Sequence, residues 1–397
     1  MNIKTIINNL NYEGKGISKH NDKVIFISNA LPEEEVELKI IETNKRYDIG
    51  EVIKYNSFSS DRVETKCPYY NECGGCNISH MNYDAQLNYK QNKLIDILKR
   101  YSDLTVTPNV IKSNNDFYYR NKITLKVING LFGYYKSKSH KLLEIKECMI
   151  ASKSINKILE QKDLLYIKNG ELIIRSNYKD EILIIINTSE EIDIKIKELL
   201  DVSNIVGIIV NGEIIYGLDF FYEKRGDYTF KVDYKSFFQV NNYILDAISE
   251  ILNKNEYKTV VDLYCGVGVL GSFINFNKLY GIEVSDSLKD AKYNSKMNDM
   301  INTKYIQGDS SRIKDIEEEI DLLIIDPPRK GIDNKTLENI LEKNPNNIIY
   351  MSCDPMSLAR DLNKLKNVYD IKESYVLDMF PQTHHVETVV LMSKVEK

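Results

Sequence analysis

A cysteine at the end of an apolar run is the residue of this chain best placed to act as a nucleophile. Residues 348–352 (Ile-Ile-Tyr-Met-Ser) precede Cys353, and Asp354-Pro355 follows it. This pattern predicts a buried strand that ends at the thiol. Ligands bind at the carboxyl ends of the strands in an open α/β sheet, so a thiol there is a candidate nucleophile. The rest of the chain must supply the sheet and the reaction partner.

A second apolar run leads into a glycine turn. Residues 259–263 are followed by Tyr264 and by a turn that contains Gly266 and Gly268. Glycine lets the backbone approach a ligand closely, and Glu283, which ends the next predicted strand, can accept hydrogen bonds from both hydroxyls of a ribose. These residues predict a site for a ligand that carries a ribose.

Strands alternate with helices beyond residue 233, which is the pattern of a parallel sheet. A third predicted strand ends at Gly308-Asp309, and a fourth leads into Asp326-Pro-Pro-Arg329. The whole set resembles the Rossmann-like α/β fold of S-adenosylmethionine-dependent methyltransferases more than that of a dinucleotide dehydrogenase. We therefore expect residues 233–397 to form a class I methyltransferase domain.

Three cysteines that lie close together in the sequence indicate a metal site. Cys67, Cys73 and Cys76 have five and two residues between them, and Cys148 follows further along the chain. Four thiolates can hold zinc or an iron–sulfur cluster, and the spacing does not choose between them. The x3-x2 triplet of radical enzymes is absent, which favours a structural role over a redox role.

The chain before residue 233 is rich in β-prone runs. Residues 1–56 are punctuated by glycine and proline and predict a compact barrel, in which the run Glu33–Glu35 is expected to be a solvated loop. Residues 57–232 predict a mostly β central domain that carries the cysteine site. Helical spacing over residues 79–101 predicts a helix that docks on the catalytic domain.

The charge and hydropathy of the chain limit the kinds of partner that it can have. The 397 residues carry a net charge of −5, which argues mildly against a nucleic-acid partner. Residues 61–150 nevertheless hold 14 Lys and Arg against 9 Asp and Glu. No apolar run approaches the roughly 18 residues of a membrane span, and the first residues open no signal peptide. We expect a cytoplasmic protein with no membrane partner and no obligate protein partner.

Seven motifs together carry a resemblance that runs nearly end to end. They are Cys67-x5-Cys73-Gly-Gly-Cys76, Tyr119-Arg-Asn-Lys122, Phe237-Phe-Gln239-Val-Asn241, Asp262-Leu-Tyr-Cys-Gly-Val-Gly268, Asp326-Pro-Pro-Arg329, Ser352-Cys-Asp-Pro355 and His385-Val-Glu387. In these motifs the chain resembles the RNA uracil-5-methyltransferase family. Its amino-terminal barrel resembles TRAM, an OB-like module of RNA-modifying enzymes.

The resemblance implies a reaction and a role for individual residues. Carbon 5 of uracil is a poor nucleophile until a thiolate adds at carbon 6, which would be the role of Cys353. Glu387 would be the general base that removes the proton from carbon 5. The residues implied to bind the methyl donor, S-adenosylmethionine, are Gln239, Tyr264, Glu283, Asp309 and Asp326.

The resemblance also bears on the cluster and the substrate. Family members that carry both TRAM and the cysteine motif are similar to bacterial ribosomal RNA enzymes. This implies a [4Fe-4S] cluster at the four cysteines, with zinc left open, and 23S rRNA as the substrate before ribosome assembly is complete. A tRNA uracil-54 C5-methyltransferase and a catalytically inactive RNA-binding factor remain as alternatives, and the presence of both Cys353 and Glu387 counts against the second.

Overall fold

The computed structural model describes residues 2–395 and divides into two compact units. The first unit comprises Met1–Lys93, Tyr134–Leu143 and Phe380–His385, and the second comprises Leu94–Gly133, Glu144–Met379 and Val386–Lys397. The chain therefore passes between the units several times. The predicted domain boundaries at residues 56 and 232 stay a prediction. No helix among the described residues is long and apolar enough to span a membrane.

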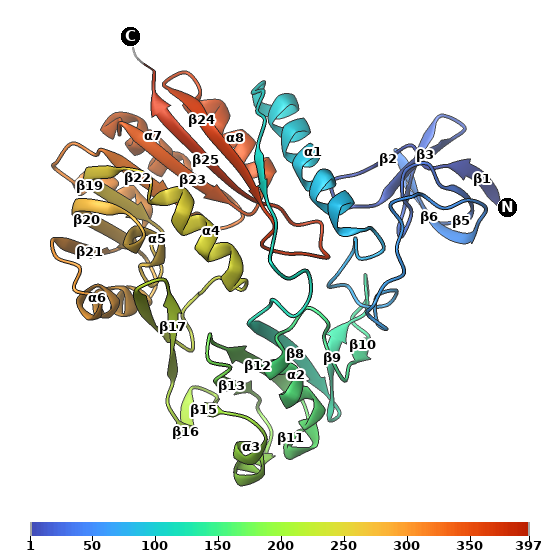
Figure 1. Ribbon diagram of the computed structural model, residues 1–397. Coiled ribbons are helices and arrows are strands. Elements are labelled where there is room, and N and C mark those ends of the chain that lie inside the picture. Colours follow the sequence, from blue (N-terminus) through green and yellow to red (C-terminus); the bar gives the residue numbers. More distant parts are fainter. Residues whose placement is uncertain (1, 396–397) are drawn as a thin grey trace. The chain divides into compact units, whose positions relative to one another are not determined.

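A small β-barrel begins the first unit (Figure 1). Its strands are β1 (Ile3–Ile6), β2 (Asn9–Leu10), β3 (Gly16–His20), β4 (Lys23–Ile27), β5 (Glu35–Thr43) and β6 (Tyr47–Tyr55). They pair in the order β1-β5-β6-β4-β3-β2, and the Asn8 N–H donates to the carbonyl oxygen of Ile17, which joins the end of β1 to β3. Alternate apolar residues, among them Ile25, Ile27 and Leu38, fill the interior because side chains alternate along a strand.

One residue of the expected solvated loop is in fact buried. Glu34 has no exposed surface, and its carboxylate accepts hydrogen bonds from the Arg62 guanidinium and from the backbone N–H of Leu31 (2.8 Å). The expectation was wrong for Glu34 because a lone acidic run gives no sign of a cation from a later segment. Glu33 and Glu35 are exposed as expected.

The sheet predicted for the catalytic domain lies in the second unit. Its strands are β7 (Asn109–Ile111), β19 (Glu256–Leu263), β20 (Asn275–Glu283), β21 (Thr303–Gln307), β22 (Leu322–Ile325), β23 (Asn347–Ser352), β24 (Tyr369–Leu377) and β25 (Glu387–Lys394). They pair in the order β21-β20-β19-β22-β23-β25-β24-β7. The five strands from β21 to β23 are parallel, and β25 is antiparallel to both neighbours. The edge strand β7 comes from a part of the chain that was not predicted to join this sheet.

Helices connect these strands and flank the sheet (Figure 1). They are α4 (Asn242–Leu252), α5 (Val269–Ser272), α6 (Leu288–Met297), the 3-10 helix η2 (Ser310–Asp315), α7 (Asn334–Lys343) and α8 (Pro355–Leu365). The predicted helix at residues 79–101 is α1 (Tyr83–Ser102), and Lys366 donates to the carbonyl oxygen of Ser102 at its carboxyl end (2.9 Å). A cation at that end compensates the partial negative charge of the last carbonyls.

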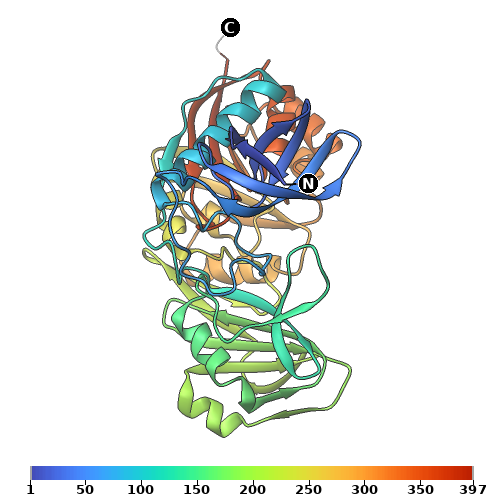
Figure 2. The same cartoon turned by 90° about the vertical axis from the view of Figure 1, so that its right-hand side faces the viewer.

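A second sheet occupies the middle of the chain. Its strands are β8 (Lys122–Ile128), β9 (Leu131–Tyr135), β10 (Leu142–Glu144), β12 (Gly170–Ser176), β13 (Ile182–Asn187), β15 (Ile205–Val210) and β16 (Glu213–Gly217), and they pair in the order β10-β9-β8-β12-β13-β15-β16. Residues 182–186 are all buried, as expected of a central strand. The helices of this region are α2 (Lys153–Glu160), which packs on β12, η1 (Lys162–Leu164) and α3 (Ile196–Val202) (Figure 2). Two further strand pairs are β11 (Leu165–Ile167) with β14 (Ile192–Ile194), and β17 (Phe220–Arg225) with β18 (Tyr228–Asp233).

Candidate active site

The edge of the catalytic sheet gathers the residues predicted to react. Asp326 follows the last residue of β22, and Cys353 follows the last residue of β23. Thr388 pairs with Ser352 across β25 and β23, so Glu387 at the start of β25 lies beside the end of β23. Parallel strands β22 and β23 end at the same edge of the sheet and the antiparallel β25 begins there, so the three residues lie together at that edge.

Burial and neighbouring charge hold the Cys353 thiol in its protonated form. Burial first, and then the negative charges of Glu387 and Asp326, raise the pKa of this thiol to about 11, while the nearby Arg329 guanidinium lowers it. Since the thiolate is the nucleophilic form, only a small fraction of the free protein carries the reactive species near neutral pH.

Asp326 and Glu387 form a pair of interacting carboxyl groups. Burial raises the pKa of Asp326 to about 7. Burial and the charge of Asp326 also raise the pKa of Glu387, a 3% exposed residue, and Arg329 opposes this shift. Two close carboxyl groups in a low dielectric do not both ionise readily, so the pair retains a proton near neutral pH. Such a pair can donate one proton and accept another.

The glycine turn after β19 fixes the acid predicted to hold a ribose. The Gly266 N–H donates to Oε2 of Glu283 (3.0 Å), and the Ser285 N–H donates to its Oε1 (2.8 Å). Gly266 has a φ of 53° and Gly268 a φ of 88°, which glycine adopts without strain. A Cβ atom added at Gly266 would meet nothing within 4 Å. An open turn beside a fixed carboxylate fits a donor that carries a ribose.

The buried carboxyl group of Asp262 supports the segment that follows this glycine turn. Oδ2 of Asp262 accepts a hydrogen bond from the Gly271 N–H (3.0 Å), and no residue among 2–395 partners its Oδ1. Burial, followed by the charges of Asp326 and Glu283, raises the pKa of Asp262 to about 8, although the Gly271 hydrogen bond opposes the shift. Asp262 is therefore largely neutral near pH 7.

Tyr264 follows β19 and Asp309 follows β21, the two strands that flank β20 in the sheet. Tyr264 follows β19 with a φ of 62°, and its hydroxyl accepts a hydrogen bond from Oγ of Ser310 (2.7 Å). Asp309 is exposed, and its Oδ1 accepts a hydrogen bond from the Ser311 N–H (3.0 Å), which caps η2. The side chain of Ser311 and then its backbone N–H lower the pKa of the Asp309 carboxyl. Their contacts with a methyl donor stay predictions.

Gln239 lies on the segment that joins the hairpin β17–β18 to α4. It is partly buried, and its carbonyl oxygen accepts a hydrogen bond from Nδ2 of Asn121 (3.0 Å). The buried Arg175 donates to the carbonyl oxygens of Asp233, Tyr234 and Ser236, which holds the start of this segment. The role of the Gln239 side chain stays a prediction.

The predicted cysteine site has one local feature of a cluster ligand. The Gly75 N–H donates to Sγ of Cys73 (3.4 Å), and such bonds tune iron–sulfur centres. Cys67, Cys73 and Cys76 are partly buried residues of the first unit, and Cys148 belongs to the second. Across residues 2–395, however, no three His, Cys, Asp or Glu side chains are arranged to hold a metal ion. The side chains as placed do not form a finished metal site, and the ligand role of the four cysteines stays a prediction.

Arg329 is the functional residue that sequence reasoning missed. The sequence places it in a motif without a role of its own, yet its charge lowers the pKa of both Cys353 and Glu387. The available signal was a cation three residues after an acid at a strand end. An exposed cation at that position can stabilise a thiolate or a developing oxyanion.

The strand order, the glycine turn and the acid at the end of β20 define a class I S-adenosylmethionine-dependent methyltransferase domain. A family profile described as tRNA (Uracil-5-)-methyltransferase matches residues 82–395, and a TRAM domain profile matches residues 4–53. The chain belongs to the tRNA (uracil-5-)-methyltransferase family and is an RNA methyltransferase. The predicted family and the predicted TRAM barrel are thereby confirmed.

Proteins with similar sequences can be aligned with nearly the whole length of the chain. An uncharacterized RNA methyltransferase of Halalkalibacterium halodurans is 32% identical over 98% of this chain and 96% of its own length. One from Clostridium acetobutylicum is 33% identical over 97% and 95%. The crystal structure of Pyrococcus abyssi tRNA (uracil-54, C5)-methyltransferase in complex with S-adenosyl-L-homocysteine has a TM-score of 0.80 and 24% identity, covering 98% of this chain and 100% of that chain. This last likeness shows a shared fold.

Proposed function

We propose that this protein transfers a methyl group from S-adenosylmethionine to carbon 5 of a uridine in 23S rRNA through a covalent adduct of Cys353. The observation that carries the proposal is the position of Cys353 beside the carboxyl pair Asp326 and Glu387 at the edge of a methyltransferase sheet. A thiol, a base and a carboxylic acid are the three groups that this reaction needs.

In the proposed reaction, the Cys353 thiol first gives its proton to solvent. Sγ of the resulting thiolate then bonds to carbon 6 of the uracil, and the electrons of the ring double bond move to the oxygen on carbon 4. The enolate then attacks the methyl group of the donor, whose sulfur leaves as a neutral thioether. A base removes the proton from carbon 5, and the Sγ–C6 bond breaks to restore the double bond and release the thiolate. The uridine must leave its stack to reach the thiol.

The carboxyl pair supports both proton steps of this scheme. A donor to the uracil oxygen must carry a proton, and the pKa of about 7 at Asp326 leaves this carboxyl substantially protonated near neutral pH. Glu387 accepts the proton from carbon 5 once it is ionised. The same pair therefore stabilises the enolate oxygen and completes the elimination.

The choice of 23S rRNA rests on the resemblance in which TRAM and the cysteine motif occur together. The second candidate is uridine 54 of tRNA, because the Pyrococcus abyssi fold neighbour is a tRNA (uracil-54, C5)-methyltransferase.

Substrate choice can be decided with purified protein and S-adenosylmethionine. We expect incubation with 23S rRNA transcripts, followed by nuclease digestion and mass spectrometry, to reveal 5-methyluridine, and total tRNA to gain none. Methylation confined to tRNA would replace 23S rRNA by the second candidate. Equal results for the wild type and Cys353→Ala with both RNAs would contradict the proposed activity.

We further propose that Cys67, Cys73, Cys76 and Cys148 bind a [4Fe-4S] cluster of structural function. The support is the cysteine motif itself and the Gly75 N–H bonded to Sγ of Cys73. Protein purified without oxygen is expected to show a visible charge-transfer band and about four iron atoms per chain. Cys76→Ala should lose the band and Cys353→Ala should keep it. One zinc per chain and no band would assign a zinc site instead.

A further inference from the structure

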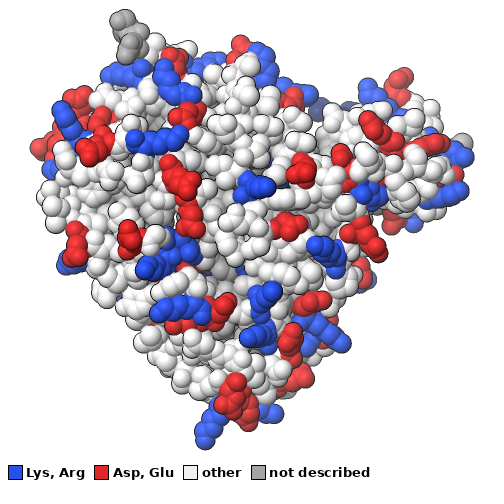
Figure 3. All heavy atoms as spheres, viewed as in Figure 1, with Lys and Arg blue, Asp and Glu red and all other residues white. Residues whose placement is uncertain are grey.

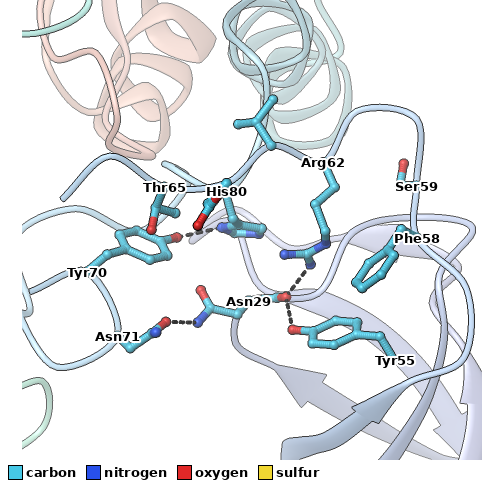
Figure 4. Close-up of a pocket in the computed structure, with 11 residues that line it drawn as sticks. Asn29, Tyr55, Phe58, Ser59, Arg62, Thr65, Tyr70, Asn71 and His80 are labelled. Carbon is cyan, nitrogen blue, oxygen red and sulfur yellow. Dashed lines mark hydrogen bonds between the residues drawn. The ribbon is translucent and has the colours of Figure 1, made fainter. Parts of the chain in front are cut away.

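A cleft of about 490 Å³ in the first unit lies outside the catalytic site (Figure 4). It is lined by residue 29, by the end of β6 at residue 55, by residues 58, 59 and 62–65, and by residues 70, 71 and 80. Side chains of the TRAM barrel and of the following segment therefore share one concave surface. Concave sites with an apolar wall and a few polar groups are typical of ligand binding.

One wall of the cleft is aromatic and open to solvent. Phe58 is 66% exposed and stacks on Tyr55, with ring centroids 5.3 Å apart and an angle of 29° between the planes. Arg62 covers the Tyr55 ring, with Cζ 4.6 Å from its centroid, and the Tyr55 hydroxyl donates to the carbonyl oxygen of Asn29 (2.7 Å). Tyr55 is thus fixed from several sides, and Phe58 presents a supported aromatic face.

The charge of the cleft does not favour a bare phosphate. Figure 4 shows Arg62 between His80 and Phe58. Its guanidinium is paired with the fully buried Glu34 and also donates to the carbonyl oxygen of Asn29 (2.6 Å). Glu64 places an acidic side chain in the lining itself. A neutral planar group fits this combination better than an anion.

One residue of the cleft lining has a buried polar atom without a hydrogen-bond partner among the described residues. His80 is 2% exposed, and Nε2 of its ring has no hydrogen-bond partner among the described residues. The Tyr70 hydroxyl lies 2.5 Å from Nδ1 and satisfies that ring nitrogen. Nε2 is therefore the ring nitrogen left without a partner, and an unsatisfied buried polar atom is costly.

We propose that this cleft binds an unpaired nucleobase of single-stranded RNA, which stacks on Phe58 and offers a ring nitrogen or carbonyl to the polar groups around His80. Every base has a flat π face, and a base edge carries the hydrogen-bonding groups that Nε2 of His80 lacks. Arg62 is already paired with Glu34, so base stacking would supply affinity that charge in the cleft does not. On the molecular face shown in Figure 3, acidic and basic side chains are likewise interspersed. The inference rests on the proposed RNA substrate and concerns a second contact with it.

The test compares Phe58→Ala and Phe58→Trp in the full-length protein. The probes are labelled oligouridylate and an abasic oligonucleotide of equal length, and the readout is the dissociation constant from fluorescence anisotropy. We expect Phe58→Ala to bind oligouridylate about tenfold more weakly, Phe58→Trp to retain affinity, and the abasic probe to bind every variant alike. Ile41→Ala, a 54% exposed barrel position outside the cleft, is the matched control and should change neither constant.

Two results would overturn the inference: equal oligouridylate affinity in Phe58→Ala and wild type, or an equal loss with the abasic probe. The proposed function is read separately, from covalent trapping of RNA containing 5-fluorouridine by the same preparations. Trapping without an effect of Phe58→Ala on binding would reject the cleft and leave the catalytic proposal intact. A stacking loss without trapping would support the cleft and reject the catalytic proposal.

Discussion

Cys353→Ala is expected to lose methyl transfer by a factor of the order of 10⁴ or more, because it removes the atom that bonds to carbon 6. The sharpest readout uses RNA containing 5-fluorouridine. Fluorine does not leave carbon 5 as a proton does, so the methylated adduct stays attached to the wild-type protein and migrates as a shifted band on a denaturing gel. The alanine variant should show no band.

The control for this substitution is Met356→Ala. Met356 is a 38% exposed residue of α8, three positions after the thiol and outside the proposed machinery. It should form the adduct at the wild-type rate. A shifted band that persists in Cys353→Ala would mean that another residue is the nucleophile. Loss of the band in both variants would point to damage to the fold near α8 rather than to loss of a nucleophile.

Much of the catalytic sheet could be predicted from the sequence because most of its parallel strands are short, largely apolar runs that end near a turn or a polar residue. Residues 259–263, 279–283 and 348–352 all have this form, and all lie in strands of the sheet. Strand β7 has only three residues and pairs with β24 far along the chain. The position of β7 in the sheet depends on its pairing with a strand that is distant in the sequence, and the hydrophobic periodicity of β7 itself does not reveal that pairing.

The same distinction applies to the site. Cys353 and Glu387 could be nominated because their residue types and motifs point to chemistry. The shifts in their pKa values could not be predicted from the sequence, because these shifts depend on burial and on residues that are close only in space, such as Arg329. Glu34 shows the converse error, since an acidic residue in a charged run is buried against Arg62. Both the pKa shifts at the site and the burial of Glu34 depend on contacts between segments that are separate in the sequence.

Glu387→Gln is expected to stop the reaction after methyl transfer. Glutamine cannot accept the proton from carbon 5, so the Sγ–C6 bond cannot break and turnover should fall by about 10² to 10⁴. The methylated adduct should then accumulate on ordinary uridine-containing RNA, without fluorine and only when S-adenosylmethionine is present. Denaturing gels measure the adduct, and release of 5-methyluridine measures turnover.

The substitution also makes a signed prediction about the thiol. An ionised Glu387 raises the pKa of Cys353, so its replacement by a neutral amide should lower that pKa. The alkylation of Cys353, followed by peptide mass spectrometry, should then have its midpoint at a lower pH than in the wild type. In the wild type, the raised pKa of Glu387 keeps its proton on at low pH, and turnover should therefore rise as pH increases through that pKa. Glu338→Gln, at an exposed position of α7, removes a carboxylate without touching the site and should change neither property. If Glu387→Gln formed no adduct at all while Cys353 still reacted with an alkylating agent, Glu387 would act before methyl transfer and the assignment of the base would have to pass to Asp326.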